Sequence, residues 1–427
     1  MKRFFILTFS ILTIFGCKGP TSGLGTLEGF VYQKSNSDRA LPNVAVIYGD
    51  SAIYTNSDGF FRYDTIPEGL QGITFRKDGY FDYIARLNIS RDIVNTTTIE
   101  LELDICGWAV GEVDSYFGTI LRTTNGGQNW VRQGAPSMIP EVDLLDVCTI
   151  NDKECFVVGE PDLTHRKPTI LYTSDGGNEW KNVATQSIPA VSYGAVITKD
   201  GKNIWCASSD SSIIVRSSDG GKSWKTAINS ENMKYYSALT THNGNEIWAC
   251  GLSVNGGAAV EYSSDGGNSW EFIPINGSSG IQKATDIYAE RDGILILTGD
   301  TGLGLMESDD LGFTWKSISS LGSGNSLYTL SVHENMTIRT ASEAGTLYTS
   351  TPEGVFNNVF PNNFDNSYKV TDISFIRDGF CGAAIFTDSD GLSSYILYTT
   401  DGGANWNEST MPYHFPMRNI DFAGGNN

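Results

Sequence analysis

The sequence predicts an all-β protein in which a small β-sandwich is followed by a seven-bladed β-propeller closed by the C-terminal strand. One observation is an eight-residue pattern that recurs in five good and two weaker copies, with steps of 50, 44, 46, 45, 41 and 50 residues between their aromatic ends. A period of about 40–50 residues fits one four-stranded blade. The other is an alternation of apolar and polar residues, with a turn about every ten residues, before position 104. The predicted parts are a signal peptide at 1–17, a linker at 18–23, the sandwich at 24–103 and the propeller at 104–427.

The first residues have the parts of a secretory signal. Lys2 and Arg3 are basic, Phe4–Phe15 is a short apolar run, and Gly16 is a small residue before a break. The run is too short to span a bilayer comfortably. We therefore expect export from the cytoplasm.

The end of this signal, Ile14-Phe15-Gly16-Cys17, resembles a bacterial lipobox. The resemblance implies that Cys17 carries a diacylglyceryl group, so that lipid chains anchor the mature protein to a membrane. Lys18, and not Asp, follows the cysteine, which by the habit of such lipoproteins permits sorting to an outer membrane. The periplasmic or surface face stays open. The alternative is an ordinary cleaved signal with an incidental Cys, because Phe15 is bulky for the motif.

Composition agrees with a folded, exported protein and limits its partners. The chain has 427 residues, a hydrophobic content of 40% and a formal net charge of −20. This charge argues against nucleic acid or an anionic membrane surface as the main partner, and favours a neutral or cationic ligand. No metal-ligand spacing, nucleotide-binding loop or nucleophile motif occurs, so we expect no metal, no cofactor and a monomer.

Six cysteines remain after Cys17. Cys148 and Cys155 flank a turn (TINDKE), so they are placed to face each other across a hairpin and to oxidise in the cell envelope. The sequence leaves open whether they do. The other four lie in apolar strand runs and are typical of small buried residues.

Residues 24–103 form a separate module. Alternating segments such as GTLEGFVYQ and TTTIELEL predict an antiparallel sandwich. The order of the segments resembles a carboxypeptidase regulatory-like domain, which implies a transthyretin-like fold and the role of a spacer or assembly module without catalysis. Asp58-Gly59 is then a turn and not a metal site. The matching residues are Gly29, Val31, Leu41–Val44, Thr55, Asp58–Phe61, Ile66–Gly69 and Lys77–Tyr80.

The recurring pattern reads TSDGGNEW at Thr173–Trp180 and TTDGGANW at Thr399–Trp406. Asp-Gly-Gly is a turn signal, because Gly adopts positive φ freely and the Asp and hydroxyl side chains accept backbone N–H bonds. The motif resembles the Asp-box, or BNR repeat, of sialidases, sortilin-type receptors and photosystem II assembly-factor-like propellers. We expect the box residues to be structural. They are Asp175, Asp219, Asp265, Asp310, Asp401, Trp130, Trp180, Trp224, Trp270, Trp315 and Trp406.

The propeller is predicted to begin in the middle of a blade. GWAVGE (Gly107–Glu112) matches the second strand of the later blades, and no first strand precedes it. MRNIDFA (Met417–Ala423) has the pattern of the missing strand. The chain end is therefore expected to pair with Gly107–Glu112, which closes the ring and leaves no open edge.

Strand order predicts where a ligand would bind. The boxes join third to fourth strands, so the loops between second and third strands and those between blades lie on the opposite rim, at the channel mouth. Tyr-rich rims with a few charges suit sugars or protein surfaces. The candidate ligand-binding residues are Glu112, Tyr116, Glu160, Asp162, His165, Arg166, Tyr193, Tyr235, Tyr236, Tyr328, Tyr368, Tyr413, His414 and Arg418.

An enzyme is an alternative at the same mouth. Two carboxylates flanking a cleft hydrolyse glycosides, but no spacing selects a pair among Glu112, Asp114, Glu160 and Asp162. The Arg-Ile-Pro signature that usually precedes the first sialidase blade is absent. We assign no catalytic residue.

GWAVGE followed by GTILRTTNGGQNW (Gly118–Trp130) resembles the photosystem II assembly-factor-like propellers over most of 106–427. The resemblance implies a partner protein held by arginines just before the boxes. Those positions here are Arg122, Tyr172, Arg216, Tyr262, Glu307, Tyr348 and Tyr398, so the basic surface is mostly absent. We therefore expect a lipid-anchored, non-catalytic envelope protein that binds a glycan or a partner protein. A glycoside hydrolase and an assembly factor for an envelope complex are the alternatives.

Overall fold

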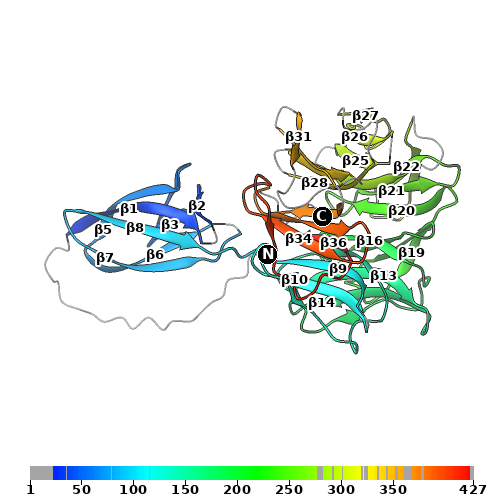
Figure 1. Ribbon diagram of the computed structural model, residues 1–427, viewed down its shortest axis with the longest axis horizontal. Coiled ribbons are helices and arrows are strands. Elements are labelled where there is room, and N and C mark those ends of the chain that lie inside the picture. The colour runs from blue at the N-terminus through cyan, green and yellow to red at the C-terminus, as the bar shows by residue number, and fades with distance from the viewer. Residues whose placement is uncertain are drawn as a thin grey trace. The chain divides into compact units, whose positions relative to one another are not determined.

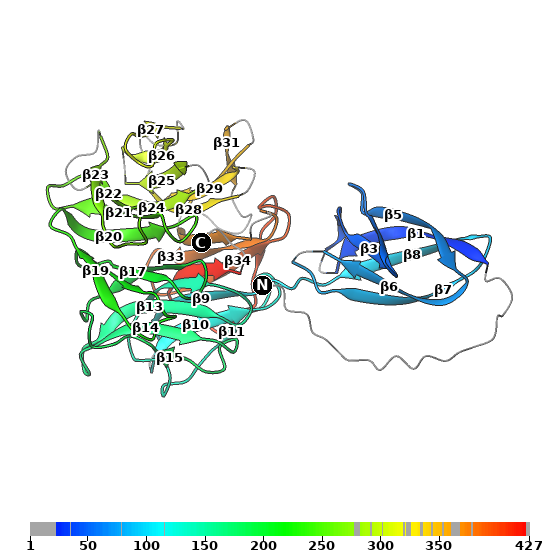
Figure 2. The ribbon, with the colours of Figure 1, turned by 180° about the vertical axis from the view of Figure 1, so that it is seen from behind.

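The computed structural model describes residues 23–34, 36–77, 79–114, 116–276, 282–290, 293–300, 302–318, 321, 326–333, 336–342, 345–351, 354–359, 368–376 and 379–423. Cys17 and the predicted signal peptide lie outside them. The chain divides into two compact units, 1–103 and 104–427, and both are built from strands (Figures 1 and 2). Within the described ranges, no helix is both long and apolar enough to cross a membrane.

The first unit contains two four-stranded sheets. In one, β1 is antiparallel to β2 and β5 and parallel to β8; in the other, the order is β4-β3-β6-β7. Their bounds are β1 Leu24–Gln33, β2 Asn36–Ala40, β3 Ala45–Tyr48, β4 Ser51–Tyr54, β5 Phe60–Pro67, β6 Gly69–Arg76, β7 Tyr83–Ile89 and β8 Val94–Leu101.

The two sheets share one apolar core, because alternate residues of strands such as β1, β5 and β6 are buried. The ring of Phe61 on β5 meets that of Phe75 on β6 with centroids 5.5 Å apart, and both are buried. Asp58 lies in the turn before β5, where its backbone N–H donates to Asn56 Oδ1 (3.0 Å) and Gly59 has a φ of 72°. The predicted turn at Asp58-Gly59 is therefore present.

The second unit contains seven four-stranded antiparallel sheets among its described residues, an arrangement consistent with a β-propeller. We number them 1 to 7 along the chain. Sheet 1 has β36 (Met417–Phe422), β9 (Gly107–Val113), β10 (Gly118–Thr123) and β11 (Val131–Arg132); sheet 2 has β12 (Leu144–Thr149), β13 (Cys155–Asp162), β14 (Lys167–Thr173) and β15 (Lys181–Asn182); sheet 3 has β16 (Tyr193–Thr198), β17 (Ile204–Ser208), β18 (Ile213–Ser217) and β19 (Lys225–Asn229). Sheet 4 has β20 (Met233–Thr240), β21 (Ile247–Ser253), β22 (Ala258–Ser263) and β23 (Glu271–Pro274); sheet 5 has β24 (Ala284–Ala289), β25 (Leu295–Gly299), β26 (Gly304–Ser308) and β27 (Lys316–Ser317); sheet 6 has β28 (Leu327–Val332), β29 (Ile338–Ser342), β30 (Leu347–Ser350) and β31 (Phe356–Val359); sheet 7 has β32 (Tyr368–Phe375), β33 (Gly382–Asp388), β34 (Ser394–Thr399) and β35 (Asn407–Glu408).

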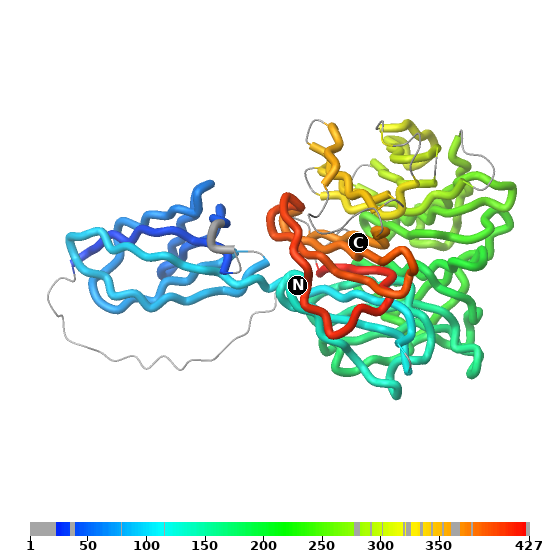
Figure 3. Tube along the Cα trace, viewed as in Figure 1, coloured from blue at the N-terminus to red at the C-terminus, as the bar shows by residue number. Residues whose placement is uncertain are grey.

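The C-terminal strand completes sheet 1. β36 pairs with β9, with Ile420 opposite Ala109, so the predicted pairing of the chain end is confirmed (Figure 3). A second contact precedes it: Trp130 N–H donates to Thr410 O (2.9 Å), and Thr410 N–H donates to Gln128 O (2.9 Å). Two separate stretches of the C-terminal region therefore hold the first sheet.

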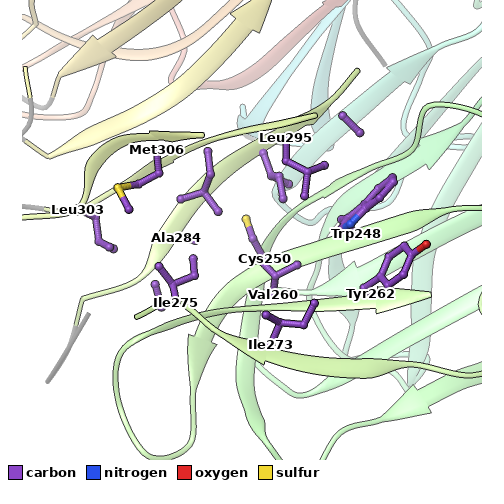
Figure 4. Packing of buried hydrophobic residues seen from close by; sticks show 14 residues of the cluster. Trp248, Cys250, Val260, Tyr262, Ile273, Ile275, Ala284, Leu295, Leu303 and Met306 are labelled. Atoms are coloured by element: carbon purple, nitrogen blue, oxygen red, sulfur yellow. The ribbon is translucent and has the colours of Figure 1, made fainter. Parts of the chain in front are cut away.

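Apolar cores fill the space between neighbouring sheets. Between sheets 4 and 5, the buried side chains of Trp248, Cys250 and Val260 pack with Ala284 and Leu295 (Figure 4). The second and third strands are buried on both faces, which explains their near-continuous apolar sequence.

The six cysteines after Cys17 are all buried, and no disulfide joins any of them to another described residue. Cys148 and Cys155 do not face each other, because Thr149 is opposite Cys155 and Cys148 is opposite Phe156. Successive residues of a strand point to opposite faces, so Cys155 packs toward sheet 1 and Cys148 toward sheet 3. The suggested cross-hairpin disulfide is therefore wrong.

The Asp-box carboxylates are hydrogen-bonded inside their own turns. Asp265 Oδ1 accepts from Ser269 N–H (2.9 Å) and from Ser263 Oγ–H (2.9 Å), while Gly266 and Gly267 have φ of 71° and 81°. Asp175, Asp219, Asp310 and Asp401 each accept from the N–H four residues later in the same way, and Asn125 does so in the first copy. The box Trp side chains are buried or half-buried against the inter-sheet cores.

Candidate functional site at the channel mouth

The turns at the two ends of a strand lie on opposite edges of its sheet. The edge with the Asp-box turns is called the box rim below. The opposite edge, with the loops between second and third strands and the connections between sheets, is the mouth rim. The inner strands of the seven sheets surround a cavity of about 270 Å³ that opens between these edges.

A β-bulge at one repeated position decides which side chains face this cavity. Every inner strand has a register shift there, and an extra residue at a bulge reverses the alternation of side chains. The bulged residues are Leu145, Gly194, Ser237, Thr285, Tyr328, Thr371 and Arg418, and all seven line the cavity. Arg418 is the one charged residue among them.

Below the bulges, carboxyl groups join four of the inner strands to the next one. Asp146 Oδ2 accepts from Val196 N–H (2.7 Å), and Asp286 Oδ2 accepts from Leu330 N–H (2.7 Å). Asp372 and Asp421 do the same for Ile420 and Thr149. Burial raises the pKa of Asp286 to about 8, and the charge of Asp372 adds to the rise. These carboxyl groups satisfy the open edges of the inner strands, which is a structural role.

Several predicted residues meet on the mouth rim of sheets 1 and 2. Arg418 forms an ion pair with Glu112, and both are partly exposed. Asp143 connects the two sheets, because its Oδ1 accepts from Val113 N–H (3.0 Å) and its backbone O accepts from Glu160 N–H (2.9 Å). Burial and the negative charge of Asp143 raise the pKa of Glu160, while Arg418 opposes the rise.

The second-to-third-strand loop of sheet 2 is held by its own side chains. Asp162 Oδ2 lies 2.6 Å from His165 Nδ1, and Asp162 Oδ1 accepts from His165 N–H (3.1 Å). Partial burial acts to raise the pKa of Asp162, but the hydrogen bonds from His165 lower it overall. Arg166 follows with a φ of 50°. The carboxylate of Asp162 and the imidazole of His165 are thus occupied with each other.

Two of the predicted tyrosines are not on the surface. Tyr193 and Tyr236 are 0% and 1% exposed, and their hydroxyl groups donate to Pro189 O and Glu261 Oε2. Each lies one residue before the bulge of its inner strand, where the side chain points into the inter-sheet core. The prediction that these two rings are open to a ligand is wrong.

The other predicted aromatic residues are spread along the mouth rim. Tyr328 lines the cavity, and Tyr235 is half-buried. Tyr395 brings Tyr368 and His414 together, with ring centroids 5.7 Å and 4.5 Å away. Tyr116 and Tyr413 are exposed. The structure therefore brings most of the candidates to one rim, but not into one pocket.

The arginines before the boxes are engaged on the box rim. Arg122 Nη2 donates to Asp152 O (2.7 Å), and Arg216 Nη1 donates to Gly266 O in the neighbouring sheet. The buried Arg339 donates to Gly379 O (3.0 Å) and Gly402 O (2.9 Å). These guanidinium groups link sheets, which leaves the mouth rim as the candidate surface.

Four residues of this surface are not among the candidate ligand-binding residues predicted from the sequence. Asp143 and Asp210 are close enough to Glu160 to act on its pKa. Leu163 and Leu392 are strongly exposed at the tips of mouth-rim loops. The sequence signal that identifies the two leucines is a large apolar residue inside an otherwise polar turn. Across the described ranges, no group of three or more His, Cys, Asp and Glu is placed to hold a metal.

The repeated sheets and their box turns define the class of this protein, a β-propeller of the Asp-box type. The family model described as photosynthesis system II assembly factor YCF48 matches residues 86–354, which is more than half of the chain. The chain belongs to this family. No curated protein matches the sequence.

Several solved structures are similar to this chain at low sequence identity. "YCF48 bound to D1 peptide" is 16% identical, with 62% of this chain and 82% of that chain covered and a TM-score of 0.47. The GH74 xyloglucanase from Xanthomonas campestris is 12% identical, with coverage of 62% and 45% and a TM-score of 0.50. The WD40 repeats of RRP9 are 10% identical, with coverage of 66% and 85% and a TM-score of 0.51. At such identities the likeness concerns the fold alone.

Proposed function

We propose that this chain is a non-catalytic binding protein whose second unit is a seven-bladed propeller, closed by β36, that holds a partner protein at its mouth rim. Membership in a family described as an assembly factor supports a partner of this kind. One observation carries the proposal. The carboxylate of Glu160 accepts no hydrogen bond from any described residue, whereas every box carboxylate is engaged in its own turn.

The first unit is proposed as a transthyretin-like sandwich that separates the propeller from a membrane. Two stacked sheets with a common core support it. A lipid on Cys17 would anchor the chain in the cell envelope, at an outer membrane. The test is labelling with a radioactive fatty acid. Cys17→Ala should abolish labelling and move the protein to the soluble fraction, and a labelled Cys17→Ala protein would contradict the anchor.

A glycan is the second candidate ligand, because Tyr116 and Tyr413 present exposed rings on the same rim. Hydrolysis of a glycoside is less well supported. It needs two carboxyl groups on either side of the bond, but Glu112 is paired with Arg418 and Asp162 with His165. Asp114 is likewise paired with Arg132, so of the four candidate acids only Glu160 has no ion pair or side-chain hydrogen bond among the described residues.

The experiment compares the two rims in the full-length protein. Partners are cross-linked in intact cells and co-purified with wild type, with Glu160→Gln and with Asp219→Asn, a matched acid-to-amide change on the box rim. We expect loss of the partner with Glu160→Gln only. Equal recovery with all three proteins, together with binding on a glycan array, would replace the protein partner by a sugar. Turnover of a glycoside that Glu160→Gln abolishes would establish an enzyme.

A further inference from the structure

Large apolar side chains stand exposed at loop tips on one part of the mouth rim. Leu163 of sheet 2 is 78% exposed, Tyr116 of sheet 1 and Leu392 of sheet 7 are each 72% exposed, and Tyr413, in the connection from sheet 7 to β36, is 54% exposed. We call these four residues the apolar arc. On the mouth rim of sheets 3 to 6, Val254 is the one comparable side chain among the described residues, at 51%.

Side-chain and backbone contacts make the arc continuous. Ser394 N–H, two residues after Leu392, donates to His414 O (3.2 Å), next to Tyr413. Arg132 is close enough to Tyr413 for the tyrosine to act on its pKa, and Arg132 Nη1 lies 2.8 Å from Asp114 Oδ2. Asp114 Oδ1 in turn accepts from Tyr116 N–H (3.2 Å).

The same support continues to the last member of the arc. Asp143 joins the loop of sheet 1 to Glu160 of sheet 2, and β13 then leads to Leu163. Contacts thus link each loop of the arc to the next one, so the four residues belong to one surface.

An excess of negative charge lies on the channel side of the arc. Burial, and then the charges of Asp143, Asp210 and Glu112, raise the pKa of Glu160, whereas Arg418 acts to lower it. Arg418 is already paired with Glu112. A cationic group beside Glu160 would relieve this repulsion, and a hydrogen bond between two charged groups is stronger than one between two neutral groups.

Resting on the proposed function, we infer that the apolar arc is a docking surface for a protein segment that places a Lys or Arg side chain against Glu160 and large apolar side chains against Leu163, Tyr116 and Leu392. Charge complementarity selects the cation. The branched aliphatic tips select protein over sugar, because sugars stack on flat rings, whereas protein interfaces have an apolar centre with a polar rim. Exposed apolar groups of this extent mark such contacts.

The experiment selects short random peptides on the full-length protein and measures their affinity for variants. Glu160→Gln removes the charge and Leu163→Ser removes an apolar tip. Val254→Ser is the matched control, because Val254 is also an exposed apolar residue at a loop tip but lies on the opposite side of the mouth rim. All three residues are exposed, and circular dichroism verifies the fold. Leu392→Ser serves as a second apolar variant.

We expect selected peptides to be enriched in Lys or Arg close to aromatic or aliphatic residues. Their affinity should fall about tenfold or more in Glu160→Gln, Leu163→Ser and Leu392→Ser, and should change less than about twofold in Val254→Ser. Added salt should weaken wild type more than Glu160→Gln.

Two different failures are distinguishable. Peptides that lose affinity in Leu163→Ser but have no excess of basic residues would overturn the cationic partner and leave a protein-binding mouth intact. Peptides whose affinity none of the mouth variants changes would overturn both the arc and the proposed function. A glycan whose binding needs Tyr116 but not Leu163 would overturn the arc as a protein surface.

Discussion

The two rims of the second unit use carboxylates in opposite ways. On the box rim, Asp219 accepts hydrogen bonds from Ser223 and Ser217, and these lower its pKa to about 2. On the mouth rim, burial and neighbouring acids raise the pKa of Glu160. The difference teaches that the carboxylates at the repeated box positions complete the fold, while Glu160, at the irregular end of β13, is left without such a role. Substitutions on the two rims should therefore have different consequences.

The largest effect is expected from Trp248→Ala on β21. The ring is 1% exposed, stacks on Tyr262 and donates from Nε1 to Leu311 O of the next box (3.1 Å). Removing it should lower the free energy of unfolding by about 3–5 kcal/mol, measured by urea unfolding. Trp248→Phe keeps most of the packing and should cost less. A loss below about 1 kcal/mol for Trp248→Ala would break the comparison.

Arg339→Met tests a second contact with the box rim. The guanidinium group donates to two carbonyls of sheet 7 and contacts His333, so its loss should lower the free energy of unfolding by about 2–4 kcal/mol.

The same arginine affects the pH dependence of stability. Burial, and then the charge of Arg339, lower the pKa of His333 from 6.5 to about 3. The unfolded chain then takes up a proton that the native state does not, so stability should fall as pH falls through this window. Arg339→Met should weaken that acid dependence, and an unchanged profile would contradict it.

A smaller effect, of opposite pH sign, is expected in the channel. The pKa of Asp286 is raised from 3.8 to about 8, so the unfolded chain releases a proton that the native state keeps. Its contribution to stability is complete below 3.8 and is lost as pH rises toward about 8. Asp286→Asn keeps an acceptor for Leu330 N–H and should gain about 1–2 kcal/mol over wild type near the top of this window. Parallel stability profiles for the two proteins would rule this out.

The smallest effect is expected from Glu160→Gln on the mouth rim. Because this carboxylate has no hydrogen-bond partner among the described residues, the free energy of unfolding should change by less than about 0.5 kcal/mol. Asp265→Ala on the box rim, which removes an acceptor for Ser269 N–H, should by contrast lower the melting temperature. Equal shifts for both variants would erase the distinction between the rims.

The features that the sequence predicted are those with a repeated local signal. The pairing of β36 with β9 followed from the likeness of MRNIDFA (Met417–Ala423) to LLDVCTI (Leu144–Ile150). Both segments are the inner strand of their sheet. Tyr193 and Tyr236 were misplaced because a bulge shifts the alternation by one residue, and a bulge has no signature in a single strand. Arg418 is the bulged residue of its own strand, and it lines the cavity.

Parts of the site depend on contacts between distant residues, and these leave no local pattern. Nothing near Glu160 in sequence shows that Asp143, Asp210 and Arg418 surround it. Likewise, the turn between Cys148 and Cys155 suggested opposed thiols, but the register sets them on opposite faces. Register and loop contacts are thus what the structure adds.

Strand β36 also sets the order of events during synthesis. The ion pair between Glu112 and Arg418 joins residues 306 positions apart. The inner edge of β9 therefore stays unpaired until the six following sheets and β36 have been synthesised. Long-range pairing of this kind slows folding, and an unpaired strand edge invites pairing with another chain. A nascent chain therefore stays vulnerable to aggregation until its last strand arrives.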